Sequence, residues 1–137
     1  GSEGSSGGLI ISDFNFCRDG VLASALIASV IVNRKENLAS IIKSLPQYYC
    51  LREKMNCNRK EAYQILKTVA KEEDGDIDSL DGVRIIKNNR SWVLIRPSNT
   101  ENIIRISVEA KTEKNASELM KSYKDKISKI LKEGETS

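Results

Sequence analysis

Hydrophobic and polar residues over the first 46 positions follow patterns typical of one short strand and two helices. The apolar run at residues 9–11 predicts the strand. Residues 21–32 are apolar on all sides and follow Asp19, which predicts a buried helix. A second helix follows and ends at Pro46, where we place a boundary between two domains, residues 1–46 and 47–137. Its apolar stripe is Leu38, Ile41, Ile42 and Leu45.

The pattern after Pro46 begins with a strand over residues 48–55 and continues with an amphipathic helix. Asn58 followed by Glu61 resembles a capping box and predicts where this helix starts. Residues 72–82, "EEDGDIDSLDG", then read as an acidic turn. The apolar positions of the helix are Ala62, Ile65, Leu66 and Val69.

Three strands and a last helix complete the pattern. Val83–Ile86 and residues 91–95 are joined by "KNNR", which is a hairpin signal, and Ile103–Ala110 alternates apolar and polar residues. Asn115 with Glu118 repeats the capping pattern, and an apolar stripe follows. The order strand, helix, three strands, helix predicts an α+β fold with two helices on one face of a mostly antiparallel sheet. The last stripe is Leu119, Met120, Tyr123, Ile127 and Ile130.

Composition narrows the class of protein. The 137 residues are 39% hydrophobic and 30% charged, which is enough apolar material for a core. The net charge of +3 is too small, and the basic residues too dispersed, to indicate nucleic-acid binding. We expect Trp92 to be a core residue. With no histidine, a His-based triad or His metal ligand is excluded from this chain.

Cysteine spacing and apolar run lengths indicate the compartment. Cys17, Cys50 and Cys57 match neither a zinc pattern nor an even disulfide framework, so we expect reduced thiols. The longest apolar run, residues 21–32, is too short for a membrane span, which needs about 20 residues. The opening "GSEGSSGG" is neither cationic nor apolar, so we expect no signal peptide. These features predict a cytoplasmic protein without a membrane partner.

The segment "RPSNTEN" between two strands has more polar chemistry than a tight turn requires. A turn can point several backbone N–H groups into one concavity that binds anions. Arg96 can donate two parallel hydrogen bonds to a phosphate or carboxylate, and Ser98 and Thr100 add hydroxyl donors. Asn99 tolerates a left-handed backbone. The segment therefore suits a phosphate, although a polar turn with a surface arginine has the same composition.

"RPSNTENIIRISVEA" resembles the "RPSGTEPxxRxxxEA" segment of the α-D-phosphohexomutase family, which includes phosphomannomutase, phosphoglucomutase and phosphoglucosamine mutase. Upstream, "EGSSGGLIISDFNFCRDG" resembles the sugar-recognition loop and following strand of that family. The resemblance implies the end of an α/β third domain, then a TATA-binding-protein-like fourth domain. The chain would lack the phosphoserine loop and the magnesium loop, so we expect it to contain no catalytic residue and to be inactive alone.

The resemblance also implies an activity and partners. The full enzyme would interconvert hexose 1-phosphate and hexose 6-phosphate, using Mg²⁺ and a hexose 1,6-bisphosphate that this part would not itself bind. This part would contact the phosphorylated hexose and pack against upstream domains of the same enzyme. We take phosphomannomutase or phosphoglucomutase as the first reading and phosphoglucosamine mutase as an alternative. A rival from another class is a non-catalytic module that binds an anion or a protein.

Carried over by position, the resemblance assigns site residues. Glu3 and Ser5 match the pair that contacts sugar hydroxyls, in a loop that appears one residue longer than usual and lacks its histidine. Asn102 replaces the usual proline. The phosphate-binding residues would be Arg96, Ser98, Asn99, Thr100 and Arg105.

The acidic run "DGDIDS", residues 74–79, looks like a metal loop. Its alternating carboxylates suit a hard cation. An EF-hand, however, needs a glycine where Ser79 stands and a glutamate where Ile85 stands, and the family's magnesium loop needs an arginine. We therefore expect a solvated acidic turn and no metal site.

Overall fold

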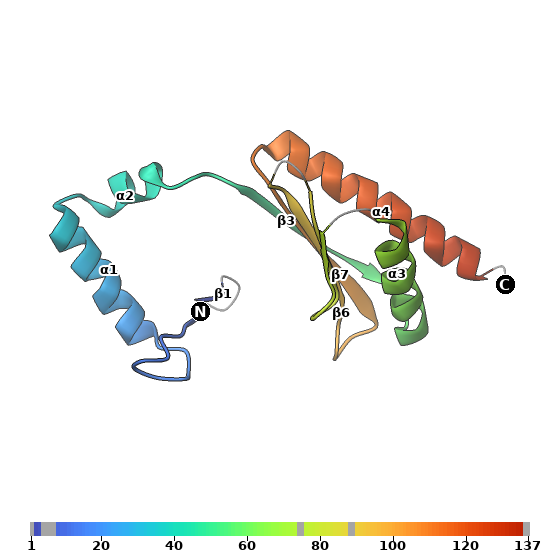
Figure 1. Ribbon diagram of the computed structural model, residues 1–137, viewed down its shortest axis with the longest axis horizontal. Coiled ribbons are helices and arrows are strands. Elements are labelled where there is room, and N and C mark those ends of the chain that lie inside the picture. Colours follow the sequence, from blue (N-terminus) through green and yellow to red (C-terminus); the bar gives the residue numbers. More distant parts are fainter. Residues whose placement is uncertain (1, 4–7, 74–75, 88–89, 136–137) are drawn as a thin grey trace. The chain divides into compact units, whose positions relative to one another are not determined.

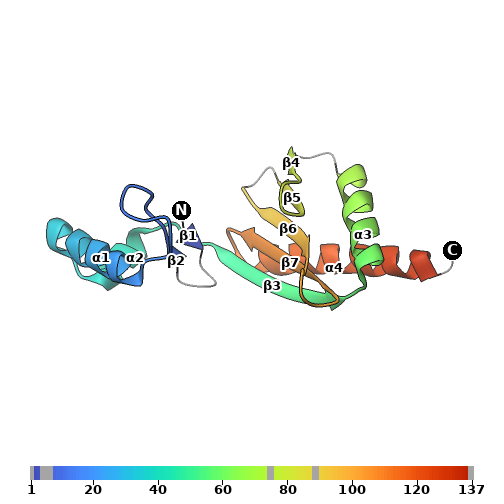
Figure 2. The same cartoon turned by 90° about the horizontal axis from the view of Figure 1, so that it is seen from below.

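The computed structural model describes residues 2–3, 8–73, 76–87 and 90–135. It separates into two compact units, Gly1–Pro46 and Gln47–Ser137. Each unit has its own secondary structure, shown as ribbons in Figures 1 and 2.

The first unit contains two very short strands and two helices. β1 (Ser2–Glu3) pairs antiparallel with β2 (Gly8–Leu9), so the strand predicted over residues 9–11 is reduced to its start. α1 (Gly20–Arg34) begins where Asp19 accepts a hydrogen bond from the backbone N–H of Leu22, and α2 (Leu38–Ser44) ends shortly before Pro46. Both predicted helices are therefore present.

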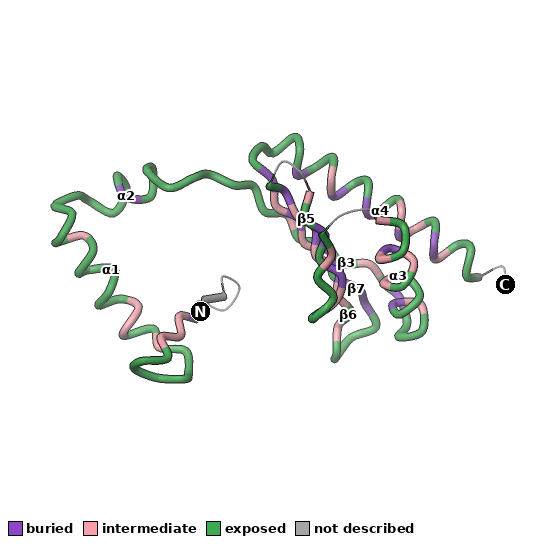
Figure 3. Tube along the Cα trace, in the orientation of Figure 1, coloured by how far each residue is buried: buried purple, intermediate pink, exposed green. Residues whose placement is uncertain are grey.

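The prediction that the first helix is buried was wrong. No residue of α1 is buried, and Val21 and Val32 are 84% and 72% exposed. In the burial-coloured trace of Figure 3, α1 is mostly green for exposed, with short pink stretches of intermediate burial. An apolar helix is buried only where another layer covers it, and the described part of this unit offers α1 only short neighbours.

The second unit is a five-stranded antiparallel sheet in the order β3-β7-β6-β5-β4 with two helices. The strands are β3 (Tyr49–Asn56), β4 (Asp76–Asp78), β5 (Val83–Ile86), β6 (Trp92–Pro97) and β7 (Ile103–Ala110). α3 (Arg59–Glu72) and α4 (Glu113–Glu135) both lie against the same face of the sheet (Figures 1 and 2). The predicted α+β fold with two helices on one face is confirmed.

The core lies between the sheet and the two helices. Successive strand residues point to opposite faces, so alternate positions of β5, β6 and β7 reach it. The fully or nearly buried members are Val83, Ile85, Val93, Ile95, Ile104, Ile106, Val108 and Ala110 from the strands, Ala62, Ile65, Val69, Ala116, Met120, Tyr123, Ile127 and Ile130 from the helices, and Cys57 between β3 and α3.

Two sequence predictions in this unit were wrong. The acidic turn contains an edge strand, β4, in which the half-buried Ile77 packs on the core between two exposed aspartates. Trp92 is on the sheet face opposite the helices, because Val93 and Ile95 take the core positions of β6. Its indole N–H donates to Glu109 at 2.9 Å, and the Arg84 guanidinium lies 5.2 Å from its ring centroid.

The two predicted capping patterns differ in outcome. Asn58 caps α3, since its side chain accepts from the Glu61 N–H at 3.0 Å while the Glu61 carboxylate accepts from the Asn58 N–H at 2.7 Å. α4 instead begins after Thr112, whose hydroxyl accepts from the Asn115 N–H at 3.2 Å. The asparagine at 115 is therefore inside the helix and is not its cap.

These two asparagines give a matched pair of mutations. We expect Asn58→Ala to lower the free energy of unfolding by about 1 kcal/mol, because the first turn of α3 loses a side-chain acceptor. Asn115→Ala removes no capping bond and should change the free energy of unfolding by less than about 0.5 kcal/mol. Urea denaturation followed by circular dichroism measures both, and equal effects would contradict the assigned caps.

None of the helices in the described part of the chain is long and apolar enough to cross a bilayer. The three cysteines are free, with Cys57 buried and the other two exposed.

Candidate phosphate-binding site

The loop between β6 and β7 folds around the hydroxyl of Ser98. This Oγ accepts from the backbone N–H groups of Thr100 and Glu101 at 3.4 and 3.3 Å. The base of the loop is closed by the Ser98 N–H, which donates to the Ile103 carbonyl at 2.9 Å. Hydrogen bonds longer than about 3.2 Å are weak. The Thr100 and Glu101 N–H groups therefore point at the Ser98 hydroxyl, and a stronger acceptor placed there could replace it.

Two arginines stand beside this loop. Arg96 on β6 and Arg105 on β7 are directly opposite each other in the register of the sheet. Like charges at such positions destabilise a strand pair. Each guanidinium has a carboxylate partner: Asp81 accepts from Arg96 at 3.0 Å, and Glu101 accepts from Arg105 at 3.1 Å. These two ion pairs offset the repulsion between the guanidinium groups, so both arginines can lie beside the loop.

A cleft of about 360 Å³ lies on this side of the loop. It brings together all five residues that the sequence assigned to phosphate binding. Those residues come from two strands and the turn between them, so the β6–β7 register decides that they share one cleft. Its lining is Arg96, Ser98, Asn99, Thr100 and Arg105, with Leu66, Leu80, Asp81, Gly82 and Pro97.

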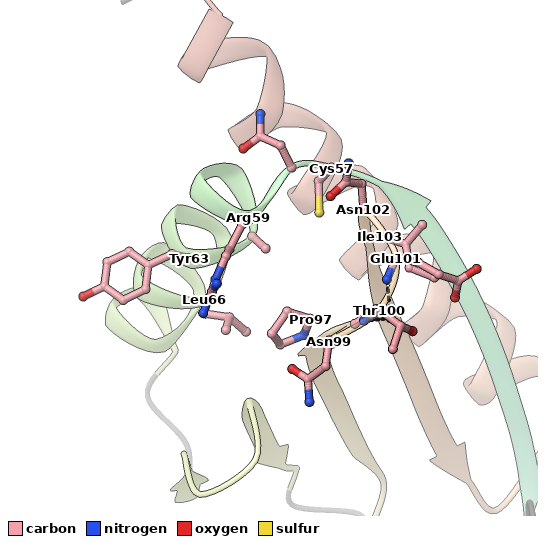
Figure 4. A pocket seen from close by; sticks show the side chains of 13 residues that line it. Cys57, Arg59, Tyr63, Leu66, Pro97, Asn99, Thr100, Glu101, Asn102 and Ile103 are labelled. Atoms are coloured by element: carbon pink, nitrogen blue, oxygen red, sulfur yellow. Dashed lines mark hydrogen bonds between the residues drawn. The ribbon is translucent and has the colours of Figure 1, made fainter.

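A second cleft, of about 370 Å³, lies between the same loop and the start of α3. Figure 4 shows Arg59 and Tyr63 coming from the helix, Pro97 from the end of β6, and Asn99 and Thr100 from the loop. The backbone joins the two walls, because the Cys57 N–H donates to the Asn102 carbonyl at 3.1 Å. Sequence reasoning missed the α3 residues, since the only signal was their helical spacing, which an exposed helix face also has.

The predicted sugar-contacting residues belong to the first unit. Glu3 lies in β1, where its backbone pairs with Gly8, and its side chain is not described. Ser5 lies outside the described residues. The assignment of these two residues therefore stays a prediction.

The described residues contain no group of three or more acidic, cysteine or histidine side chains that could hold a metal ion. Asp74 and Gly75, the first residues of the acidic run, lie outside the described part. Asp78 uses its carboxylate locally, accepting from the Leu80 N–H at 3.0 Å.

Comparison with known proteins identifies the family. Residues 54–126 match the family described as phosphoglucomutase/phosphomannomutase, C-terminal domain, and residues 1–49 match its alpha/beta/alpha domain III. A crystal structure of a phosphoglucomutase/phosphomannomutase family protein from Burkholderia thailandensis has the same fold, with a TM-score of 0.73 at 17% identity. That match covers 92% of this chain and 27% of the other.

Two other relatives are more similar in sequence. A probable phosphoglucosamine mutase of Methanopyrus kandleri is 34% identical over 131 residues, which cover 93% of this chain and 29% of the relative. A probable phosphoglucosamine mutase of Methanothermobacter thermautotrophicus is 40% identical over 117 residues, which cover 81% and 26%. The chain thus spans under a third of the length of these relatives. It belongs to the phosphoglucomutase/phosphomannomutase family, the α-D-phosphohexomutases, as the loop sequence indicated.

Proposed function

We propose that this chain supplies the substrate phosphate-binding part of a phosphohexomutase that interconverts hexose 1-phosphate and hexose 6-phosphate. The observation that carries the proposal is one cleft lined by two arginines and two hydroxyls, beside two backbone amides that donate weakly to the Ser98 hydroxyl of that cleft. The two relatives named probable phosphoglucosamine mutase favour a hexosamine phosphate as the first substrate to test.

The residues of the cleft make different contributions to binding the phosphate that does not react. Arg96 and Arg105 neutralise its two negative charges, because charge-assisted hydrogen bonds from guanidinium groups are the strong ones. The Thr100 and Glu101 amides turn from the Ser98 hydroxyl to the phosphate oxygens. Phosphoryl transfer asks a protein mainly for positioning and charge stabilisation. The cleft would position the sugar by holding the phosphate at the end that is not reacting.

The described residues do not fit a magnesium site, so we assign no step through a metal to this chain. The Mg²⁺, the hexose 1,6-bisphosphate and the phosphoserine of the reaction would be held by other parts of the enzyme. We accordingly expect the chain alone to bind phosphate without catalysing transfer. We also propose that it packs against those parts in the complete enzyme, whose cellular location we expect to be the cytoplasm.

The direct test is a titration of isotope-labelled chain with glucosamine 6-phosphate, followed by backbone amide NMR. Signals of Ser98, Thr100 and Glu101 should shift, inorganic phosphate should move the same signals, and glucosamine alone should not. Arg96→Ala should weaken binding by roughly 10- to 100-fold, the effect of losing a charge-assisted pair of hydrogen bonds.

Arg84→Ala is the matched control. Arg84 is a cation on β5 that stacks on Trp92 and does not line the cleft. Its replacement should leave the affinity for phosphate within about twofold, the range of a surface change. If Arg96→Ala and Arg84→Ala lost affinity for phosphate equally, binding would depend on the overall charge of the chain. That result would contradict the assignment of the site. Unchanged binding in Arg96→Ala would do the same.

A further inference from the structure

We infer that Asp81 is a positioning residue that holds the Arg96 guanidinium in the orientation needed to bind phosphate. This inference rests on the proposed function of the cleft and adds to it a residue outside the β6–β7 loop. Asp81 precedes β5, 15 positions before Arg96 in the sequence, and lines the same cleft.

The geometry of the pair leaves the binding edge of the arginine available. Arg96 donates from Nη1 to Oδ2 of Asp81 at 3.0 Å. Among the described residues this is the one hydrogen bond that its guanidinium makes. A guanidinium carries five N–H groups in a rigid fork. With Nη1 held, the edge formed by Nε and Nη2 can still donate two parallel hydrogen bonds to an anion.

Arg96 needs a carboxylate partner because a second arginine lies next to it. Arg105 is directly opposite on β7, and two facing guanidinium groups repel each other. The Arg96 side chain is also 39% exposed, so without a partner it would be free to turn toward solvent. The strands β5, which Asp81 precedes, and β7, which carries Arg105, flank β6 on opposite sides, so Asp81 attracts the Arg96 guanidinium away from Arg105, whose own partner is Glu101.

The turn that carries Asp81 is built to lie against β6. Gly82 has a φ of +107°, which favours glycine. A Cβ at this glycine would lie 2.3 Å from the Ile95 carbonyl oxygen and 2.9 Å from the Arg96 Cβ. Only a residue without a side chain permits this approach, and the approach brings the preceding aspartate to Arg96.

If Asp81 instead competed with phosphate for Arg96, the expected effect of its removal would be the reverse. If Asp81 merely occupied Arg96 until phosphate displaced it, removing the carboxylate would strengthen binding. A positioning role predicts weaker binding. The Asp81 side chain is 78% exposed, so its through-space repulsion of the phosphate is screened by water. We therefore expect the loss of orientation to outweigh the gain in electrostatic attraction.

The experiment compares Asp81→Ala, Asp81→Asn and Asp76→Ala in the full chain, with inorganic phosphate as the ligand. Asp81→Ala should weaken phosphate binding by roughly three- to tenfold, the size of one typical hydrogen bond. The phosphate affinity of Asp81→Asn should lie between those of the parent chain and Asp81→Ala, because the asparagine amide oxygen still accepts from Arg96. Asp76 is an exposed aspartate on β4 that does not line the cleft, so Asp76→Ala reports the effect of charge alone.

A second readout needs no ligand. The Nε–H order parameter of Arg96, measured by NMR relaxation, should fall in Asp81→Ala and stay unchanged in Asp76→Ala. Tighter phosphate binding in Asp81→Ala, or an Arg96 Nε–H as ordered as before, would overturn the inference. Failure of the proposed function is seen separately, because Arg96→Ala would then leave phosphate binding unaffected.

Discussion

Gly82→Ala should destabilise the second unit by about 3 kcal/mol or more. The positive φ of Gly82 costs an alanine roughly 1–2 kcal/mol, and the new Cβ would meet the Ile95 carbonyl oxygen at 2.3 Å. That contact can be relieved only by moving the β5–β6 backbone, since neither atom is the end of a flexible side chain. Overpacking of this kind adds typically 1–3 kcal/mol. A domain of this size has about 5–14 kcal/mol of stability in total.

Urea denaturation of the whole chain measures the effect, and Gly134→Ala is the control. Gly134 lies in α4, where an added Cβ would come no closer than 3.5 Å to the Gln64 side chain. There alanine should be neutral or stabilise by up to about 1 kcal/mol, because glycine is a poor helix former. If the two glycines tolerated alanine equally, the close approach of the 81–82 turn to β6 would be wrong, and with it the placement of Asp81.

The second large effect concerns Glu73, which joins three elements at the end of α3. Its carboxylate accepts from Lys126 of α4 at 2.8 Å and also from Lys87, which directly follows β5. Both ammonium groups lie over the ring of Tyr123, at 5.7 and 5.9 Å from its centroid. The Glu73 side chain is only 11% exposed, so water screens these interactions little.

The pKa values in this cluster follow from its geometry. Burial by itself would raise the pKa of Glu73, but the hydrogen bonds from Lys126 and Lys87 outweigh it and lower the pKa from 4.5 to about 2. Burial and the neighbouring Glu73 carboxylate raise the pKa of Tyr123. The ionised carboxylate is therefore more stable in the folded chain than in the unfolded chain.

We expect this cluster to make stability fall in acid. A lowered folded pKa adds stability that is complete above the unfolded value of 4.5 and is lost as the pH falls from there through about 2. The shift corresponds to roughly 3 kcal/mol. Glu73→Gln should lose about that much at neutral pH, and the difference between the two proteins should shrink toward pH 2. Urea denaturation at a series of pH values measures this.

Glu72→Gln is the control for the acid dependence. Glu72 also faces Lys126, at 3.4 Å, but its side chain is 52% exposed. Exposed ion pairs contribute at most about 1 kcal/mol, so this variant should nearly retain the parent profile. A Glu73→Gln protein that stays parallel to the parent down to pH 2 would contradict the lowered pKa.

Much of the fold could be read from local patterns. The strand over Ile103–Ala110 is found at its predicted bounds, because alternation with period two depends only on which face of one strand is buried. The capping box of α3 is equally local, since Asn58 and Glu61 satisfy each other. The same pattern failed at Asn115, because Thr112 offers an earlier cap that the pattern did not weigh.

The candidate site could be predicted in part. The family resemblance assigned five residues within one short segment, and they line one cleft because the two strands that carry Arg96 and Arg105 are joined by the turn between them. Asp81 and Arg59 could not be found that way. Their places beside the loop depend on the strand order and on the backbone bond from Cys57 to Asn102, which join distant parts of the chain.

By itself the sequence determined the type of nearly every element, the α+β class and the family, because these depend on local periodicity and contiguous motifs. Only the tertiary structure decided which face Trp92 takes, which carboxylate holds Arg96, and that α1 has no covering layer in the described part of its own unit. The physical reason is the same in each case. Burial and ion pairing depend on contacts between segments that are distant in the sequence. The strand register sets those contacts, and it cannot be predicted from either segment alone.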